Sequence, residues 1–196
     1  MIRVIEAAQQ IAQPWKNGGG STTQIVSHPE GATLDAFDWR ISMARVEMDG
    51  PFSLFPQIDR TLAILDGEGV VLEVEGLAQI TVTGASPPAR FPGDCATQAR
   101  LIRGPIIDLN VMSRRGRFRH RLARIPVDGA SAVSVSADTL VALSLGEVEI
   151  RIGQERRELK PGDAALVEAG GTQRISLSSG ENTVVWLVEI ESLGGA

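Results

Sequence analysis

An arginine that follows a stiff loop is the first residue of this sequence suited to binding a ligand. Arg60 follows a connection in which two prolines and the aromatic residues Phe52 and Phe55 restrict the chain. A guanidinium held in this way can grip a carboxylate through two parallel hydrogen bonds. The spacing equally allows an ion pair with the neighbouring Asp59 or Asp66. The chemistry indicated is recognition of an organic anion, with a simple ion pair as the alternative.

Two segments with strand-like patterns, residues 39–47 and 107–114, carry polar groups that could complete an anion site. Because side chains alternate between the faces of a strand, one face of each segment is apolar and the other polar. The polar faces carry Arg40, Ser42, Asp108, Asn110, Met112 and Arg114. Inside a barrel such groups would line a pocket, since a buried charge needs a partner or a ligand. We expect Met112 and Phe91 to cover its apolar part. The alternative is that solvent wets the polar faces.

Three consecutive glycines form the most unusual local string, Trp15-Lys-Asn-Gly-Gly-Gly-Ser. The amides of Gly18, Gly19 and Gly20 could form an anion-binding nest, and Asn17 adds a hydrogen-bonding side chain. The string matches neither a phosphate-binding P-loop nor a dinucleotide fingerprint. We expect it to close the mouth of the pocket, and a flexible turn is the alternative.

The sequence offers little for metal or cofactor chemistry. Its two histidines, His28 and His120, lie far apart in the chain and form no ligand pattern, so we expect neither a metal nor a cofactor. An enzymatic alternative is a cofactor-free isomerase or hydrolase acting on a small carboxylate. Its general base would be Asp108, His120 or Glu47.

A basic run interrupts an otherwise acidic chain. The formal net charge is −5, which argues against a general nucleic-acid binder. Within residues 114–124, however, six arginines occur without an acid. Contact with DNA through this run is a third hypothesis, ranked last because no helix that could read a groove is predicted. The competing interpretation is a solvated connector or a set of charges at strand edges.

Short β-strands must position all of these residues. Apolar segments rich in Val, Ile and Leu end at Gly, Pro, Asp or Asn about every 8 to 12 residues, which predicts an all-β sandwich or barrel with little helix. The best helical candidate, residues 5–12, is marginal because it is so short. The composition and the absence of a long apolar run favour a cytoplasmic protein without a membrane span.

A faint internal repeat suggests two similar units. The segment that begins Arg60-Thr-Leu-Ala recurs approximately at Asp138-Thr-Leu-Val, and Phe91-Pro-Gly-Asp is matched by Lys160-Pro-Gly-Asp. We therefore expect two small antiparallel β-barrels, residues 1–115 with the pocket and residues 116–196 without it. The second barrel lacks polar sets on one strand face, so we interpret it as structural or as a homodimer contact.

Five strings, taken together and in order, resemble the HutD/Ves family over residues 10–120. They are Trp15-Lys-Asn-Gly-Gly-Gly, Trp39-Arg-Ile-Ser-Met-Ala, Gly50-Pro-Phe-Ser-Leu-Phe-Pro followed by Asp59-Arg60, Phe91-Pro-Gly-Asp, and Asp108-Leu-Asn-Val-Met-Ser-Arg-Arg-Gly. Beyond residue 120 the similarity is carried by the pattern around Lys160-Pro-Gly-Asp. One departure is Gln57, because we expect a glycine after Phe-Pro in many members of that family.

The resemblance implies a bicupin: two packed cupin-like jelly rolls that lack metal-binding histidines. It also implies an accessory or regulatory protein of bacterial histidine utilisation, without an enzymatic step. The ligand it implies is a small organic acid, urocanate or N-formylglutamate. The family's carboxylate contact maps onto Arg60.

Overall fold

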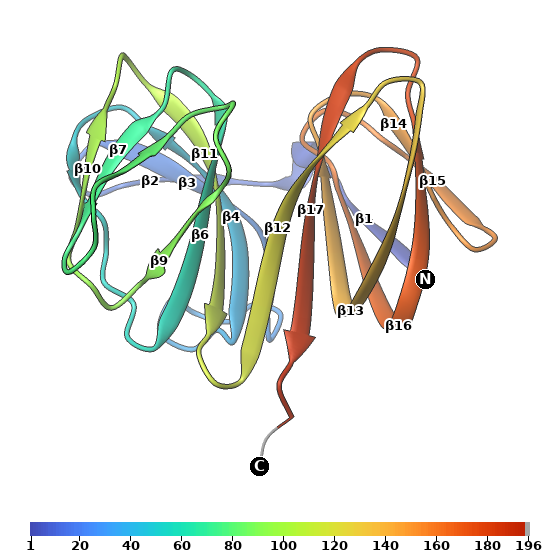
Figure 1. Ribbon diagram of the computed structural model, residues 1–196, viewed down its shortest axis with the longest axis horizontal. Helices are drawn as coiled ribbons and strands as arrows, with labels where there is room; N and C mark the ends of the chain where they lie inside the picture. Colours follow the sequence, from blue (N-terminus) through green and yellow to red (C-terminus); the bar gives the residue numbers. More distant parts are fainter. Residues whose placement is uncertain (195–196) are drawn as a thin grey trace. The chain divides into compact units, whose positions relative to one another are not determined.

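The computed structural model describes residues 1–194, whose regular secondary structure consists of β-strands and one short 3-10 turn (Figure 1). The segment 5–12 is not an α-helix. It contains the end of strand β1 (Ile2–Ile5), the 3-10 turn η1 (Ala7–Gln9) and the start of strand β2 (Ala12–Pro14). A helix of about two turns is not stable by itself, and the pairing of β1 with another strand prevails.

The chain divides into two compact units, and the first ten residues do not belong to the unit we expected. Residues Ile11–Phe118 form the N-terminal unit, whereas Met1–Gln10 join the chain from Arg119 onward in the C-terminal unit. Strand β1, drawn in dark blue in Figure 1, pairs antiparallel with β16, with Ile2 opposite Val167. The partner of a short N-terminal strand is a long-range choice that the sequence pattern does not specify.

Two antiparallel sheets build the N-terminal unit. Their order in space differs from their order in the chain. The larger sheet contains, in order, β2, β3 (Gly20–His28), β4 (Trp39–Val46), β11 (Ile106–Arg114), β6 (Ile58–Asp66) and β9 (Ala89–Pro92). The smaller contains β5 (Gly50–Pro51), β10 (Thr97–Leu101), β7 (Val70–Val74) and β8 (Ile80–Val82). Apolar side chains of both sheets form one buried core, which includes Leu62, Ile64 and Leu72.

A single sheet builds most of the C-terminal unit. It contains, in order, β12 (Phe118–Val127), β17 (Thr183–Ser192), β13 (Ala130–Ser144), β16 (Ala164–Ser178), β14 (Val148–Ile152) and β15 (Glu155–Leu159), with β1 beside β16. Its hydrophobic core includes Leu140, Ile150 and Ile175, which are fully buried. The polar residues His120, Ser144 and Asp163 of this unit are also buried.

The two Pro-Gly-Asp turns of the repeat have different roles. In the C-terminal unit, Asp163 closes its turn by accepting the Lys160 amide at 2.9 Å, and it also accepts the Ala7 amide at 2.8 Å. In the N-terminal unit, Asp94 instead forms an ion pair with Arg115 at 2.9 Å. Similar local sequence therefore anchors the N-terminal segment in one unit and an arginine in the other.

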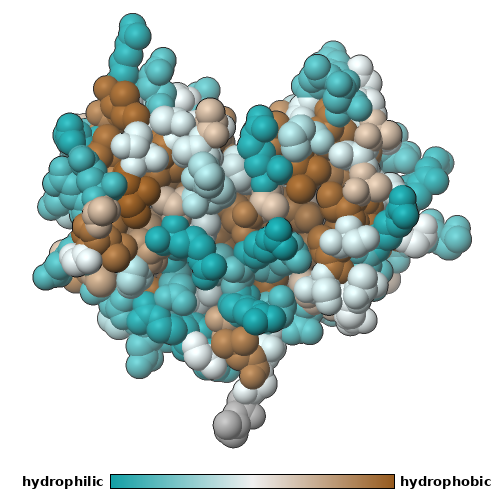
Figure 2. Space-filling view, viewed as in Figure 1, coloured by the Kyte–Doolittle hydropathy of each residue, from teal (hydrophilic) through white to brown (hydrophobic). Residues whose placement is uncertain are grey.

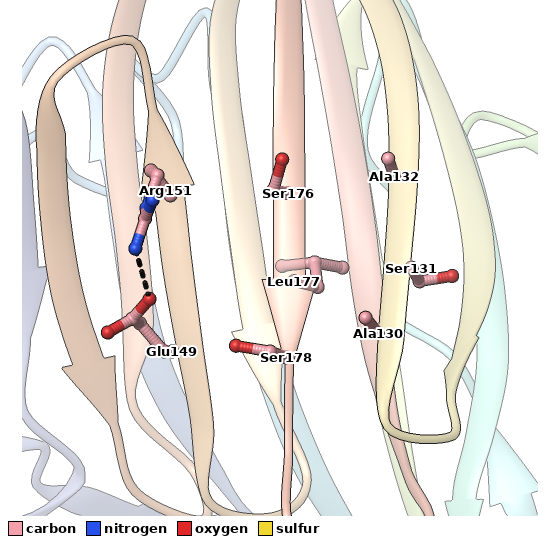
Figure 3. Close-up of a pocket in the computed structure, with 8 residues that line it drawn as sticks. All are labelled: Ala130, Ser131, Ala132, Glu149, Arg151, Ser176, Leu177 and Ser178. Carbon is pink, nitrogen blue, oxygen red and sulfur yellow. Dashed lines mark hydrogen bonds and ion pairs between the residues drawn. The ribbon is translucent and has the colours of Figure 1, made fainter.

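The surface mixes polar and apolar residues. In Figure 2, hydrophobic areas of limited extent are separated by hydrophilic ones over the visible face. The hollow in Figure 3, about 300 Å³, lies on the C-terminal unit where the small residues Ala130, Ala132, Ser176 and Ser178 flank the Glu149–Arg151 pair. Within residues 1–194, no helix has the length and apolar character needed to cross a membrane.

Candidate functional site

Strand register brings four of the residues singled out from the sequence into one row. Arg60 on β6 lies opposite Met112 on β11, and Met112 lies opposite Arg40 on β4. On the other side of β6, Arg60 lies opposite Phe91 on β9. Directly opposed residues of antiparallel strands point to the same face of the sheet. Arg40, Met112, Arg60 and Phe91 therefore share one face.

The next two rows continue on that face into the core. Asn110 lies opposite Ser42, and Asp108 lies opposite Ala44. The apolar neighbours of these rows, Leu62 and Ile64, belong to the core of the N-terminal unit. The polar faces of β4 and β11 are thus turned inward, and solvent does not wet them. We call Arg40, Ser42, Arg60, Asp108 and Asn110 the interior polar cluster, all of which are buried.

Aromatic rings enclose the guanidinium of Arg60, which is only 5% exposed. Its Cζ atom lies 4.7 Å from the ring centroid of Phe52, 5.2 Å from that of Phe91 and 5.8 Å from that of Phe55. Phe52 and Phe55 come from the loop between β5 and β6, eight and five residues before Arg60. Cation–π contacts of this kind contribute about 0.5 to 2 kcal/mol each, more when desolvated. The rings hold the guanidinium in place while leaving its edge available for hydrogen bonds.

A glycine of the first Pro-Gly-Asp turn lets the backbone approach the stem of Arg60. A Cβ atom on Gly93 would lie 3.0 Å from the Ile58 carbonyl oxygen and 3.3 Å from Cδ of Arg60. The Gly93 amide donates to Ile58 O at 2.7 Å, and the Phe55 amide donates to Gly93 O at 2.7 Å. These contacts join the aromatic loop to the turn over Arg60, which explains why both strings accompany the arginine in the sequence.

Hydrogen bonds link Arg60 to Asp108 through an amide. Nη2 of Arg60 donates to Oδ1 of Asn110 at 2.8 Å, and Nδ2 of Asn110 donates to Oδ1 of Asp108 at 2.6 Å. Two buried atoms of the same series, Nε of Arg60 and Oδ2 of Asp108, have no hydrogen-bond partner in the protein. A buried polar atom without a partner costs about 1 to 3 kcal/mol. The cluster therefore retains unsatisfied donor and acceptor capacity at its centre.

Burial shifts the pKa values of Asp108 and Arg60, the two charged residues joined through Asn110. Burial raises the pKa of Asp108 to about 7, although the charge of Arg60 and the hydrogen bond from Asn110 both oppose the shift. Burial also lowers the pKa of Arg60 to about 10, with Asp108 opposing and Arg40 reinforcing the change. Arg60 is charged at neutral pH, whereas Asp108 is near its titration point. Apolar surroundings are the dominant cause in both cases.

Arg40 adds a second positive charge to the cluster. It is 8% exposed, and its Nε donates to Oε1 of Gln24 at 2.9 Å. Burial lowers the pKa of Arg40. Among the described residues no carboxylate forms an ion pair with Arg40, whose hydrogen-bond partner Gln24 is neutral and exposed. The cluster thus contains two guanidinium groups and one carboxylate.

The glycine string lies near one end of this cluster only. Gly20 lies opposite Val46, which is two residues along β4 from Ala44 in the row of Asp108 and six residues from Arg40 in the row of Arg60. Asn17 accepts the Gly19 amide at 3.0 Å within its own loop. A Cβ atom on Gly20 would lie 2.1 Å from the Arg45 carbonyl oxygen, so the glycine serves close backbone packing. That Asn17, Gly18, Gly19 and Gly20 close the pocket stays a prediction.

Arg114 and its neighbours are engaged by protein groups. Nη2 of Arg114 donates to the Phe37 carbonyl at 2.7 Å, and its Nε lies 3.5 Å from Oδ1 of Asp38. That Arg114 completes the wall of the cluster stays a prediction. The other arginines of the run pair with acids that are distant in sequence. These pairs are Arg115 with Asp59 and Asp94, Arg117 with Asp38, Arg119 with Glu191, and Arg121 with Glu189. The basic run is largely neutralised in the fold.

The proposed general bases are not brought together. Glu47 is exposed and pairs with Arg45 at 2.8 Å, near the far end of β4, and His120 belongs to the C-terminal unit. Asp108 is the one of the three that lies in the cluster. Among residues 1–194, no group of three or more His, Cys, Asp or Glu side chains is placed to hold a metal ion.

Sequence reasoning missed three residues that contact the cluster. Phe52 and Phe55 were identified as loop-stiffening residues but not as neighbours of the guanidinium, and Gln24 was not identified at all. The position of both phenylalanines in the loop that leads to Arg60 was the available signal for the first two. No local signal marks Gln24, because β3 is irregular between Gln24 and Val26 and strict alternation fails there.

Gln57 adopts a left-handed backbone with φ of 59°, a conformation that favours glycine. Such a conformation costs a residue with a Cβ atom about 1 kcal/mol relative to glycine. Gln57→Gly is therefore expected to raise the free energy of unfolding by up to about 1 kcal/mol, measured by urea denaturation. The control Gln98→Gly, in the extended strand β10, should lower it by about as much. A destabilised Gln57→Gly variant would show that the side chain makes an important contact.

Comparisons with known proteins agree on one family. A model of the family HutD matches residues 7–185. A Pseudomonas putida relative, described as an uncharacterized 21.2 kDa protein in hutC 3'region, is 33% identical over 159 residues, 81% of each chain. The protein Ves of Citrobacter koseri is 40% identical over 110 residues, 55% of this chain and 56% of that protein.

Solved structures extend the similarity over the whole fold. The structure of HutD from Pseudomonas fluorescens SBW25, formate condition, has a TM-score of 0.82 and 32% identity, covering 99% of this chain and 100% of that one. A cupin 2 conserved barrel domain protein from Leptotrichia buccalis has a TM-score of 0.59 at 13% identity, covering 95% of this chain and 98% of that one. The second likeness shows a cupin-like fold and nothing more.

Proposed function

The chain belongs to the HutD family, and we propose that its N-terminal unit binds a small organic carboxylate as an accessory or regulatory protein of histidine utilisation. The names of the relatives link the family to that process. The proposal does not include a chemical step. Arg60 is the residue that would contact the carboxylate.

The charge balance of the interior polar cluster is the observation that carries this proposal. Two buried guanidinium groups, Arg40 and Arg60, face one carboxylate, Asp108, so the cluster is positive even when Asp108 is ionised. A buried charge without a partner is costly, and an anionic ligand would supply the partner. The unpartnered Nε of Arg60 provides a donor for it. The aromatic rings around Arg60 and the side chain of Met112 provide the apolar surface that small-molecule sites usually have.

The two ligands implied by the resemblance make different demands on this cluster. N-formylglutamate carries two carboxylates and could contact Arg40 and Arg60 together, whereas urocanate carries one carboxylate on a planar ring. Arg40 and Arg60 are separated by one strand, about 10 Å between backbones. Their side chains can converge on one ligand from opposite sides of Met112. This arrangement favours a dicarboxylate.

Ligand binding is tested by titration calorimetry with N-formylglutamate and urocanate. Wild type should bind at least one of them, and saturation at 100 times the dissociation constant should stabilise the fold by about 2.7 kcal/mol. Arg40→Gln should weaken the binding of N-formylglutamate, the dicarboxylate, more than the binding of urocanate. The matched control is Arg45→Gln, on the same strand but exposed and paired with Glu47, which should bind normally. Absence of binding by both ligands and by histidine would refute the proposal.

An enzymatic role is the alternative, because a carboxyl group with a pKa near 7 suits general acid–base catalysis. A cofactor-free isomerase or hydrolase would use Asp108 as the base and Arg60 to hold the substrate. Turnover of a small carboxylate that is lost in both Asp108→Asn and Arg60→Ala would establish it. Binding without turnover favours the accessory role.

A further inference from the structure

We propose that Asp108 couples carboxylate binding to proton uptake, so that the N-terminal unit binds its ligand together with a proton taken from solvent. This inference rests on the proposed function, because it assigns a regulation to the same site. Asp108 would not contact the ligand. It would act through the guanidinium of Arg60, which interacts with both negative charges.

The coupling follows first from the connection between Asp108 and Arg60. The side chain of Asn110 bridges them, with its oxygen accepting from Arg60 and its amide nitrogen donating to Asp108. In the ligand-free protein the negative charge of Asp108 is the nearest counter-charge that Arg60 has in the cluster. A carboxylate bound to Arg60 would introduce a second negative charge beside the same guanidinium. The ligand and the ionised Asp108 therefore compete for one cation.

The surroundings of Asp108 make this competition strong. The side chain is 1% exposed, and its neighbours across the strands, Ala44 and Ile64, are apolar. Charges interact more strongly in such surroundings than in water, because the effective dielectric constant is lower. Hydrogen bonds from Asn110 and the Ala44 amide favour the ionised form, but burial outweighs them, and Oδ2 of Asp108 has no hydrogen-bond partner. Protonation is thus the least costly way for Asp108 to relieve repulsion from a bound anion.

The charged groups that face Asp108 are few and can be named. Arg60 faces it from β6 and Arg40 from β4, and along β11 the next charged side chain on this face is Arg114, which is bound to Phe37 O. The opposing strands β7 and β10 contribute the apolar residues Val70, Leu72, Val74 and Ala99 to the core. Both arginines stay charged through the neutral pH range, so Asp108 is the titrating group. Its pKa of about 7 places the transition where it would respond to physiological changes.

The test measures the pKa of the Asp108 side chain from the pH dependence of its carboxyl 13C chemical shift. Wild type is titrated with and without saturating N-formylglutamate. The pKa of Asp108 should rise by at least one unit when the ligand binds. Calorimetry at pH 7.5 in phosphate and in Tris, which differ in ionisation enthalpy, should show uptake of up to one proton per ligand. Affinity should fall by up to about tenfold per pH unit above pH 7. These measurements require no variant to fold.

Two variants separate the role of Asp108 from a general effect of pH. Asp108→Asn should bind the ligand with an affinity that changes little between pH 6 and pH 9 and without proton uptake. Asp66→Asn, an exposed carboxylate on β6, should retain the wild-type pH dependence. Binding with an unchanged Asp108 pKa and no proton uptake would overturn this inference and leave the proposed function standing. Failure of every carboxylate to bind would overturn both.

Discussion

Arg60→Ala is expected to destabilise the protein by about 3 kcal/mol or more and to abolish carboxylate binding. The change removes the counter-charge of Asp108, and truncating one member of a buried charged pair costs about 3 to 5 kcal/mol. It also leaves a space between the rings of Phe52, Phe91 and Phe55. Urea denaturation at pH 8, where Asp108 is ionised, measures the loss of stability.

A double-variant cycle identifies the cause of this loss. If the charge of Asp108 is responsible, Arg60→Ala combined with Asp108→Asn should be more stable at pH 8 than Arg60→Ala alone, by about 1 kcal/mol or more. The control Arg45→Ala removes an exposed arginine paired with Glu47 and should cost at most about 1 kcal/mol. An Arg60→Ala variant as stable as wild type would show that the guanidinium is not coupled to the buried carboxylate.

Protonated Asp108 contributes a stabilisation of the fold that decreases as pH rises. The Asp108→Asn substitution should remove this contribution to the pH dependence of stability. Because the pKa of Asp108 is raised in the folded state, the folded protein binds this proton more tightly than the unfolded chain does. The resulting stabilisation is complete below the unfolded pKa of about 4 and is lost as pH rises through about 7. Its slope is at most about 1.4 kcal/mol per pH unit. Equilibrium unfolding from pH 4.5 to pH 8.5 measures the effect.

Other carboxylates change the stability of the fold with pH in the opposite direction to Asp108. The contribution of Asp108 is therefore obtained from the difference between the variant and wild type. The hydrogen bond from Arg115 lowers the pKa of Asp94, and the amide of Ile2 lowers that of Glu155, so both favour the fold at higher pH. These contributions are common to both proteins and cancel in the difference. Asp108→Asn should therefore gain stability relative to wild type from pH 5 to pH 8. Parallel curves for the two proteins would contradict the buried titration of Asp108.

The residues of each strand face were largely predictable from the sequence. Alternation along a strand is a local property with a period of two, and it correctly grouped Arg40 with Ser42 and Asn110 with Met112. The short apolar segments and turn residues likewise predicted an all-β chain, and the order of five strings indicated the family. None of these inferences required knowledge of which strands are neighbours.

Tertiary structure decided where along the strands those residues meet. Register places Arg40 and Arg60 in one row, and it places Gly20 near the row of Asp108, six residues along β4 from Arg40. It also gave the arginines from Arg115 to Arg121 acidic partners distant in sequence. Strand pairing joins residues that are far apart in the chain, so its energy depends on packing across the whole sheet. A local pattern therefore fixes the face of a side chain, while only the assembled sheet fixes its neighbours.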